Sequence, residues 1–416
     1  MHAPLTLAAL LALGACAPAT PPADAPPDST TSRTSAATCE PLETRPPKAT
    51  DQQPAFEGQT RACADPTDVA FDVAVLATGL SHPWAVEPLP DGRLLVTERP
   101  GRLRLVSADG ALGEPITGLP AVDARGQGGL LDVALSPSFA TDRTIFWTYA
   151  EPRQGGNGTA VARGALAPDG RSVTDVRVLF RVQPTYDGDK HFGSRVDVGP
   201  DGMLYITVGE RSDAPMRPQA QLLSSHLGKT IRIAPDGSVP QDNPFVGQDG
   251  ALPEIWTTGH RNAQSAAFDA QGRLWQVEMG TAGGDELNLV ARGNNYGWPV
   301  AAYGEEYSGA DLALAETTRP GTEQPVYYWD PVIAPSGAEW YEGSAFPEWR
   351  GSLFVGALAM KRLVRLTVED GRVTGEEHLL ADRNKRIRDV REGPDGALYV
   401  VTDEDAGELW RITPRR

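Results

Sequence analysis

The sequence predicts an all-β protein, and more specifically a six-bladed β-propeller of four-stranded antiparallel blades. The chain has 416 residues, 40% of them hydrophobic, which is enough for one large domain or two ordinary ones. It contains 44 glycines and 36 prolines, its apolar runs are short, and helical periodicity is nearly absent. A turn followed by an alternating strand also recurs six times between residues 67 and 416.

Each repeat begins with a turn and continues as a strand in which inward and outward residues alternate. An Asp-Gly or Gln-Gly pair supplies the positive-φ corner of a hairpin. Spacings of about 45 to 80 residues suit four-stranded blades joined by variable loops. A β-sandwich is the alternative, but it accounts less readily for six similar units. The copies are PDGRLLVTER (90–99), SFATDRTIFWTYAE (138–151), PDGMLYITVGE (200–210), AQGRLWQVEMG (270–280), WRGSLFVGALAMKRLVRL (349–366) and PDGALYVVTDE (394–404).

Residues 1–15 are interpreted as a lipoprotein-type signal peptide. The apolar run over 5–13 is too short to span a bilayer but long enough for the hydrophobic part of an export signal. It ends in LGAC, which resembles a bacterial lipobox, so we expect Cys16 to be lipidated and to become the mature N-terminus. An ordinary signal peptide cleaved one to three residues further on is the alternative. Either interpretation predicts export, and the lipobox predicts anchoring on the periplasmic side of a bacterial membrane.

Residues 16–66 are predicted to be a tether, and residues 67–416 to be the propeller domain. The tether is rich in Pro, Ala, Thr, Ser and Asp and has few apolar side chains that could join a core. Cys39 and Cys63 lie within it. In an oxidising compartment a disulfide between them is favoured over two free thiols.

The formal net charge of −17 argues against a nucleic-acid or anionic-membrane surface, because phosphate binding needs a dense basic face. Membrane contact is therefore expected only through the lipid anchor. An anionic ligand would need a local cluster of cations, which the segment NKRIRDV offers. Side chains alternate along a strand, so Arg386 and Arg388 share one face while Lys385 and Ile387 point to the other. A basic edge strand is the alternative interpretation.

Longer motifs resemble the soluble quinoprotein glucose dehydrogenases and aldose sugar dehydrogenases from about residue 75 to the C-terminus. The resemblance implies a six-bladed propeller that uses pyrroloquinoline quinone (PQQ) and calcium to oxidise aldose sugars at C1. Hydride would pass to the quinone, giving the lactone, and electrons would leave to an external acceptor. In chain order the motifs are LSHPWAVEPLPDG (80–92), RGQGGLLDVALSP (125–137), KHFGSR (190–195), GHRNAQSAAFD (259–269), EMGTAGGDELNLVARGNNYGWP (278–299), APSG (334–337), MKRLVRL (360–366) and NKRIRDVREGPDG (384–396).

By this resemblance the catalytic residues are His191, Arg261 and Gln127. Histidine titrates near neutral pH, which suits a general base that removes the C1 hydroxyl proton. Arg261 would stabilise the charge that develops on the quinone C5 oxygen, and Gln127 would hydrogen-bond the substrate or the base. Lys190 stands where the glucose dehydrogenase has an aspartate, and a cation there would lower the pKa of His191. A histidine that only caps a blade loop is the alternative.

The resemblance also implies a cofactor site and a calcium site. PQQ carries three carboxylates, and the residues expected to bind it are Arg261, Asn262, Lys361, Arg386, Arg388 and Asp403. No carboxylate cluster has EF-hand spacing. The family instead offers two successive backbone carbonyls to calcium, which here belong to Gly280 and Thr281.

Two other functions stay open at this stage: a calcium-dependent lactonase-type hydrolase and a non-catalytic binding propeller. The two arginines favour the dehydrogenase, because a hydrolase has no reason to gather positive charge whereas a tricarboxylate quinone does. No haem-binding CxxCH motif is present. Electrons would therefore pass to a separate partner, a quinone or a cytochrome. The preferred aldose and the oligomeric state stay open.

Overall fold

The computed structural model describes residues 39–312 and 315–415. The predicted signal peptide, Cys16 and the tether up to residue 38 lie outside these residues. Within the described part of the chain, no helix is long and apolar enough to cross a membrane.

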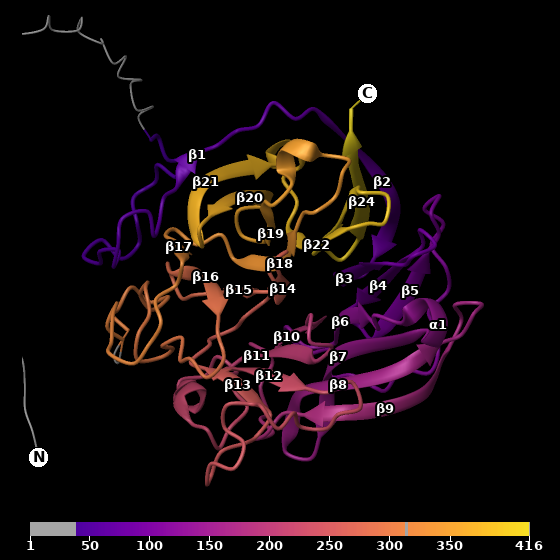
Figure 1. Ribbon diagram of the computed structural model, residues 1–416, viewed down its shortest axis with the longest axis horizontal. Helices are drawn as coiled ribbons and strands as arrows, with labels where there is room; N and C mark the ends of the chain where they lie inside the picture. Colours follow the sequence, from indigo (N-terminus) through magenta and orange to yellow (C-terminus); the bar gives the residue numbers. More distant parts are fainter. Residues whose placement is uncertain (1–38, 313–314, 416) are drawn as a thin grey trace, which may run out of the picture. The chain divides into compact units, whose positions relative to one another are not determined.

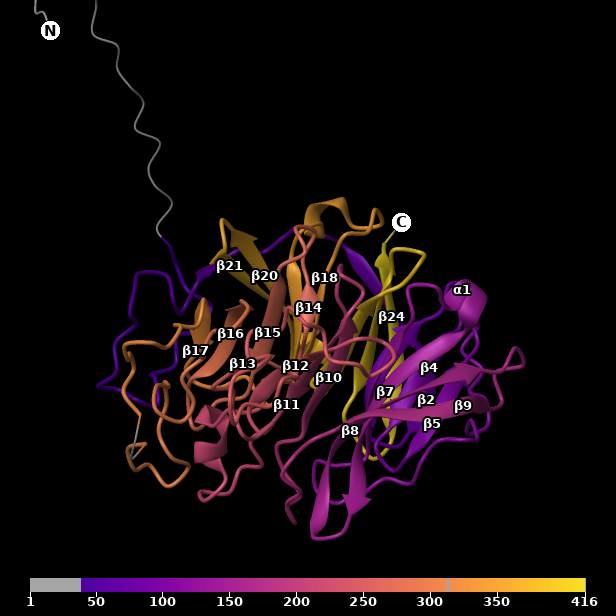
Figure 2. The same ribbon diagram turned by 60° about the horizontal axis from the view of Figure 1, so that its bottom comes forward.

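Six antiparallel sheets are arranged around a common centre, as the sequence predicts (Figure 1). One edge strand of each sheet is innermost, so six strands surround the centre of the propeller (Figures 1 and 2). These inner strands are β3 (Pro83–Pro88), β6 (Leu130–Leu135), β10 (Gly193–Val198), β14 (Ala267–Phe268), β18 (Pro335–Trp340) and β22 (Ile387–Glu392).

Four of the sheets have the predicted four strands, one has three and one has five. The three-stranded first sheet is completed by β4 (Leu94–Glu98) and β5 (Arg102–Val106). The second and third contain β7 (Thr144–Arg153), β8 (Gly156–Leu166), β9 (Val173–Arg181), β11 (Leu204–Val208), β12 (Lys229–Ile233) and β13 (Ile255–Thr258). The fourth and fifth contain β15 (Leu274–Glu278), β16 (Asp285–Val290), β17 (Tyr327–Trp329), β19 (Leu353–Ala357), β20 (Arg362–Glu369) and β21 (Arg372–Leu379).

The sixth sheet closes the ring with strands from both ends of the domain. It contains β23 (Leu398–Thr402) and β24 (Gly407–Pro414), and its outer strand is β2 (Phe71–Leu80), which pairs with β24. The few helical turns lie in connections: α1 (Phe139–Asp142), η1 (Arg217–Gln221), η2 (Pro347–Trp349) and η3 (Ala381–Arg383). The pairing of β2 with β24 joins the first and last blades through a ladder of backbone hydrogen bonds.

The six repeat units found in the sequence are the second strands of the six sheets and the turns before them. These strands are β4, β7, β11, β15, β19 and β23. Gly202 shows the expected corner, with φ of 76° in the turn before β11. In the degenerate second copy Arg143 adopts the same positive-φ conformation, with φ of 51°, although this conformation is unfavourable for a residue with a side chain.

A buried ion cluster fills the middle of the channel. Arg195 on β10 places Nη1 3.0 Å from Asp132 Oδ1 of β6 and 3.0 Å from Asp389 Oδ1 of β22. Its guanidinium also lies over the ring of Trp84 on β3, 4.3 Å from the centroid. Both carboxylates are fully buried. Residues from four blades therefore form a solid layer across the channel.

We expect the change Arg195→Met to lower the free energy of unfolding by about 3–5 kcal/mol, because it leaves two buried carboxylates without their cation. Urea denaturation of the apoprotein measures this loss. Arg350→Met, which changes an arginine exposed on the surface, serves as the matched control and should leave the unfolding midpoint unchanged. A loss below about 1 kcal/mol in the channel variant would show that the cluster is not stabilising.

Residues 39–66, hereafter the strap, form one compact unit with the propeller. The prediction of a tether is therefore wrong for this part of the chain. Cys39 and Cys63 are joined by a disulfide, and β1 (Cys63–Ala64) adds to the fifth sheet by parallel pairing with β21. The tether was predicted from a shortage of apolar residues, but the strap is held largely by polar contacts, such as those of the buried Gln59.

Candidate active site

A cavity of about 200 Å³ lies at one end of the channel, and residues from all six blades line it. Its lining includes Gln127, Asn262, Arg386, Arg388 and Asp403, five of the residues predicted from the sequence. The other lining residues are Trp84, Arg99, Leu131, Phe192, Gly193, Gln264, Met279, Ala334 and Leu358. Segments far apart in the sequence thus converge here, as inner-strand ends do in a propeller.

Three arginines and one carboxylate line this cavity. Arg386 Nη2 lies 3.2 Å from Asp403 Oδ2, and Arg388 Nη2 also donates to that oxygen. Arg99, which follows β4, is the third arginine and was not predicted. Burial alone would raise the pKa of Asp403, but Arg388 and Arg386 outweigh it and hold that pKa well below its usual value. The ionised carboxylate neutralises one of the three cations.

The side chains of residues 385–388, at the start of β22, are oriented as predicted. Lys385 turns away from the cavity and pairs with Glu404, with 2.7 Å between Nζ and Oε2. Ile387 is buried in the core between the fifth and sixth blades. Arg386 and Arg388 both lie on the cavity side, although Arg386 precedes β22 and the register with β23 shifts between Ile387 and Asp389.

His191 lies just behind the cavity wall, and its side chain is 7% exposed. Its backbone N–H donates to Gln127 Oε1 at 2.9 Å. Its Nδ1 is 3.2 Å from Oε1 of Glu210, a buried residue just after β11. Burial alone would raise the pKa of Glu210, but the hydrogen bond and charge of His191 and the nearby Arg261 lower it. Because an ionised carboxylate only accepts, the His191 proton sits on Nδ1 and Nε2 is free to accept one.

The environment of His191 favours the neutral imidazole. Burial lowers the pKa of His191 below the usual histidine value of 6.5, and the positive charge of Arg261 lowers it further, while Glu210 opposes both. Lys190, the residue expected to exert this effect, is exposed, and the main charge contribution comes from Arg261 instead. A neutral histidine with a free Nε2 is the form that a general base requires.

Arg261 and Asn262 join the cavity to the loop after β15. Arg261 Nη1 donates to the carbonyl of Met279 at 2.9 Å, and the guanidinium lies 5.3 Å from the centroid of the Trp298 ring. Asn262 Oδ1 accepts from the backbone N–H of Gly193 at 3.1 Å. Arg261 thus lies between His191 and the loop rather than on the cavity lining.

The loop at 279–284 carries the two residues predicted to bind calcium. The N–H of Gly280 donates to Asp285 Oδ1 at 2.8 Å, and Asp285 Oδ2 accepts from the N–H of Ala334 at 2.7 Å. Burial raises the pKa of Asp285 to about 7, although these backbone donors oppose the shift. Thr281 Oγ1 is buried without a hydrogen-bond partner among the described residues. Asp285 therefore ties this loop to the cavity-lining segment at Ala334.

The structure does not bring Lys361 to the cavity lining. It lies in the turn between β19 and β20, near Leu358, which does line the cavity. Sequence reasoning also missed Glu210, although a signal was present. In four of the repeats an acidic residue ends or follows the second strand, and this end of each strand reaches the cavity side. Those residues are Glu98, Glu210, Glu278 and Asp403.

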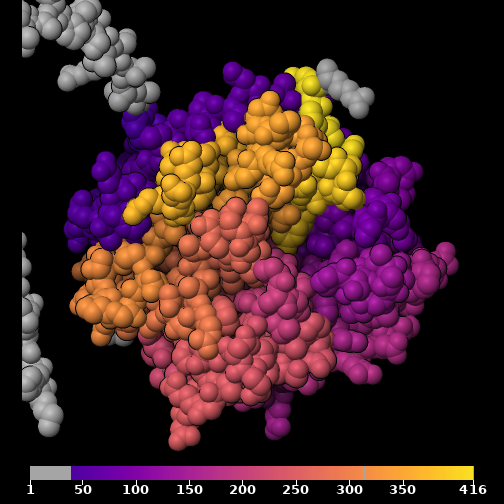
Figure 3. Space-filling model, in the orientation of Figure 1, coloured from indigo at the N-terminus to yellow at the C-terminus, as the bar shows by residue number. Residues whose placement is uncertain are grey.

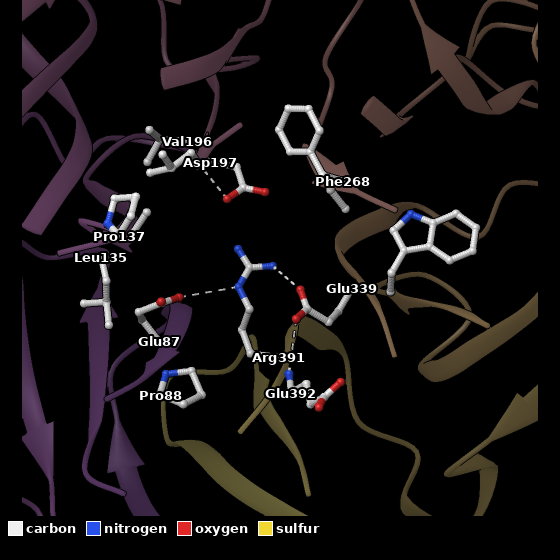
Figure 4. A pocket seen from close by; sticks show the side chains of 14 residues that line it. Glu87, Pro88, Leu135, Pro137, Val196, Asp197, Phe268, Glu339, Arg391 and Glu392 are labelled. Carbon is white, nitrogen blue, oxygen red and sulfur yellow. Dashed lines mark hydrogen bonds and ion pairs between the residues drawn. The ribbon is translucent and has the colours of Figure 1, made fainter. Parts of the chain in front are cut away.

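A second pocket, of about 350 Å³, lies at the opposite end of the channel, beyond the Arg195 layer (Figure 4). Here Arg391 Nη1 is 3.3 Å from Glu339 Oε2 and Nε is 3.7 Å from Glu87 Oε2, with Asp197 nearby. Burial raises the pKa of Asp197 to about 6 and that of Glu339 to about 7. Four carboxylates, those of Glu87, Asp197, Glu339 and Glu392, and one guanidinium line this pocket, so the two channel ends have opposite charge. An anionic ligand fits the Arg99 end.

Six blades around a common centre, each contributing residues to one cavity, define a six-bladed β-propeller with a shared site at the end of its channel. The sequence matches the glucose/sorbosone dehydrogenase family over residues 80–411. The chain belongs to this family, so the family and the enzyme class predicted from the sequence are confirmed.

Comparison with individual proteins agrees with this assignment. The aldose sugar dehydrogenase YliI of Escherichia coli (strain K12) is 45% identical over 348 residues, covering 83% of this chain and 93% of that protein. The crystal structure of the soluble aldose sugar dehydrogenase from Escherichia coli in the apo form has a TM-score of 0.81 and 44% identity. It covers 83% of this chain and 100% of that one. The PQQ-bound aldose sugar dehydrogenase from Streptomyces coelicolor has a TM-score of 0.68 and 30% identity, covering 83% and 99%.

Proposed function

We propose that this protein oxidises aldose sugars at C1 to the lactone, using PQQ and calcium, and passes the electrons to an external acceptor. The observation that carries the proposal is the excess of positive charge in the cavity, where three arginines face one carboxylate. This excess stands out in a chain of net charge −17. The name of the Streptomyces coelicolor relative, which is a PQQ-bound aldose sugar dehydrogenase, supports the same assignment.

The residues of the cavity fit a PQQ molecule. Nε of Arg99 and Nε of Arg388 are buried and have no hydrogen-bond partner among the described residues. Leaving such donors unpaired is costly, and a bound polycarboxylate would supply acceptors for them. Arg386, Arg388 and Asn262 would hold the cofactor, with Asp403 fixing the orientation of both arginines. Lys361 could contribute only from the neighbouring turn.

His191 is proposed to be the general base, with Gln127, Glu210 and Arg261 acting around it. PQQ, when bound, would supply the acceptor for the hydride of the sugar C1, and that hydride carries both electrons of the oxidation. His191 Nε2 takes the proton of the C1 hydroxyl, while Glu210 holds Nδ1–H and stabilises the imidazolium that forms. Gln127 fixes the backbone of His191 by accepting its N–H. Arg261 disfavours protonation of His191 before the reaction and offers its charge to the developing anion.

Calcium is proposed to bind the carbonyl oxygens of Gly280 and Thr281, together with oxygens of the cofactor. The unpartnered Thr281 Oγ1 supports an additional polar group in this region. A hard cation prefers such oxygen donors. The lactonase alternative would need a metal held by side-chain carboxylates and amides. Among the described residues no group of three or more His, Cys, Asp or Glu side chains is arranged to hold a metal.

The direct test is to add PQQ and Ca²⁺ to purified protein and to measure dye reduction with a panel of aldoses, alcohols and aldehydes. We expect aldose-dependent reduction that requires both additions. Hydrolysis of lactones without PQQ, and no dye reduction with any aldose, would favour the hydrolase instead.

We expect Glu210→Gln to lower turnover at saturating aldose, by less than the factor of about 10² to 10⁴ that loss of a general base costs. The carboxylate contributes to raising the pKa of His191, so its removal lowers that pKa further. The acid limb of the activity profile should therefore move to lower pH. Turnover measured against pH tests this, and an acid limb that stays in place would contradict a role for Glu210 beside the base.

We also propose that the protein is exported and held on the periplasmic side of a membrane through lipidated Cys16. Two acyl chains give stable anchoring where one does not. Cys16→Ala should therefore move the protein from the membrane fraction to the soluble fraction of fractionated cells. Equal membrane retention of the variant and the wild type would refute the anchor.

A further inference from the structure

The strap, residues 39–66, lies outside the part of the chain that defines the family. The family match begins at residue 80, and the two crystal structures compared above are matched over 99–100% of their own length while covering 83% of this chain. Figure 3 shows the indigo strap lying against the orange surface of residues around 300–312 and 315–330. A segment outside the family match that is nevertheless fixed by a disulfide calls for a role of its own.

The strap holds the backbone at residues 303–304 by side-chain hydrogen bonds. Gln52 Oε1 accepts from the N–H of Gly304 at 2.8 Å, and its Nε2 donates to the carbonyl of the same residue at 3.0 Å. The hydroxyl of Tyr303 donates to Oε1 of Gln59 at 3.0 Å. Gln59 is completely buried. Gln52 thus fixes the backbone of Gly304, and Gln59 fixes the side chain of the residue before it.

That segment in turn contacts the 279–284 loop directly. The N–H of Ala282 donates to the carbonyl of Glu305 at 2.9 Å, and the N–H of Glu305 donates back to Ala282 at 3.3 Å. At Gly284 there is no space for a side chain, because a Cβ there would lie 2.4 Å from the carbonyl oxygen of Tyr303. The backbone at 303–305 therefore forms one wall of the loop that carries Gly280 and Thr281.

The strap is fixed at several points, so it can act as a rigid support. The N–H groups of Lys48 and Ala49 donate to the carboxylate of Asp330 at 2.8 and 3.2 Å. Arg61 donates to the backbone carbonyl of Asp330 at 2.9 Å. The disulfide between Cys39 and Cys63 closes the strap into a loop, which limits how far its first residues can separate from β1.

We propose that the strap positions the 279–284 loop, with Gln52 as its main positioning residue, and thereby sets the affinity of the site for calcium and cofactor. The second part of this proposal rests on the proposed function, because it assigns calcium to Gly280 and Thr281. The first part concerns the apoprotein alone and is tested separately.

Hydrogen–deuterium exchange of the apoprotein tests the positioning of the loop. Gln52→Ala removes both bonds to Gly304, and the pair Cys39→Ser and Cys63→Ser releases the end of the strap. In each variant we expect exchange in peptides covering 279–284 to accelerate about five- to tenfold, the factor for roughly one net hydrogen bond. Arg45→Ala is the matched control, because Arg45 bonds Glu43 within the strap. Faster exchange in the strap with no change at 279–284 would overturn the proposal.

Calcium titration of the protein with PQQ present tests the consequence for the site. We expect Gln52→Ala to weaken calcium binding about five- to tenfold while turnover at saturating calcium stays near that of the wild type. Gln52→Glu keeps the acceptor but loses the donor, so it should give an intermediate affinity. Unchanged calcium affinity in Gln52→Ala would overturn this part. Wild-type protein that binds neither calcium nor PQQ would refute the proposed function, and the exchange result would still decide whether the strap positions the loop.

Discussion

His191→Gln should slow the reduction of bound PQQ by an aldose by about 10² to 10⁴-fold, the usual cost of removing a general base. Glutamine preserves the backbone N–H that bonds Gln127 but cannot take up a proton. Cofactor binding should persist, because the charge of PQQ is met by the arginines of the cavity rather than by His191. Single-turnover absorbance measures the rate, and cofactor occupancy is read from the same spectra.

His378→Gln is the matched control for this variant. His378 lies on β21, where Nε2 is 2.6 Å from Glu376 Oε1 and Nδ1 is 3.0 Å from Arg362, so we expect a rate close to that of the wild type. A near wild-type rate in His191→Gln at full occupancy would instead reduce His191 to a structural residue of the loop.

The same assignment predicts the direction of the pH dependence. Burial and Arg261 lower the pKa of His191 below 6.5, so the unprotonated base persists to a lower pH than in a free histidine. Activity should therefore hold as the pH falls through 6.5 and decline only as it passes the lowered pKa. His191→Gln should abolish this acid limb.

Arg388→Ala should weaken PQQ binding by about 2 kcal/mol or more, a factor of about 30, because it removes a buried partner of the cofactor carboxylates. The Arg388 side chain is 8% exposed, whereas that of Arg386 is 41% exposed. Burial strengthens electrostatic interactions, so Arg386→Ala should have the smaller effect. Titration of the apoprotein with PQQ, followed by absorbance, gives both affinities.

Two further variants separate the effect of losing positive charge from the effect of leaving the Asp403 carboxylate unpaired. Lys385→Ala changes the neighbouring cation, which pairs with Glu404 away from the cavity, and should leave PQQ affinity unchanged. Arg388→Ala combined with Asp403→Asn removes the carboxylate that would otherwise be left unpaired, and affinity should still fall. Wild-type affinity in that double variant would mean that the cofactor site lies elsewhere.

The parts of the fold that follow local rules could be predicted from the sequence. The six turn-and-strand units are encoded by a turn residue and alternation over a few positions, and each one is the second strand of a blade. Arg386 and Arg388 could be placed on one face from the period of a strand, but the register shift between Ile387 and Asp389 could not be predicted.

The remaining features depend on contacts between distant segments. Glu210 reaches His191 only because β11 ends beside the start of β10, and Arg99 reaches the cavity from a different blade. The strap has too few apolar residues to be recognised as folded, yet Gln52 and Gln59 bind backbone and tyrosine groups nearly 250 positions away. Such pairings have no local pattern in the sequence.

The most direct test of the central claim is single-turnover reduction of protein-bound PQQ by an aldose, compared with the same sugar deuterated at C1. If the cavity oxidises aldoses at C1, the aldose will convert the spectrum of bound PQQ to that of its reduced form, and deuterium will slow this conversion. At full PQQ and calcium occupancy, no spectral change with any aldose would contradict the proposed function.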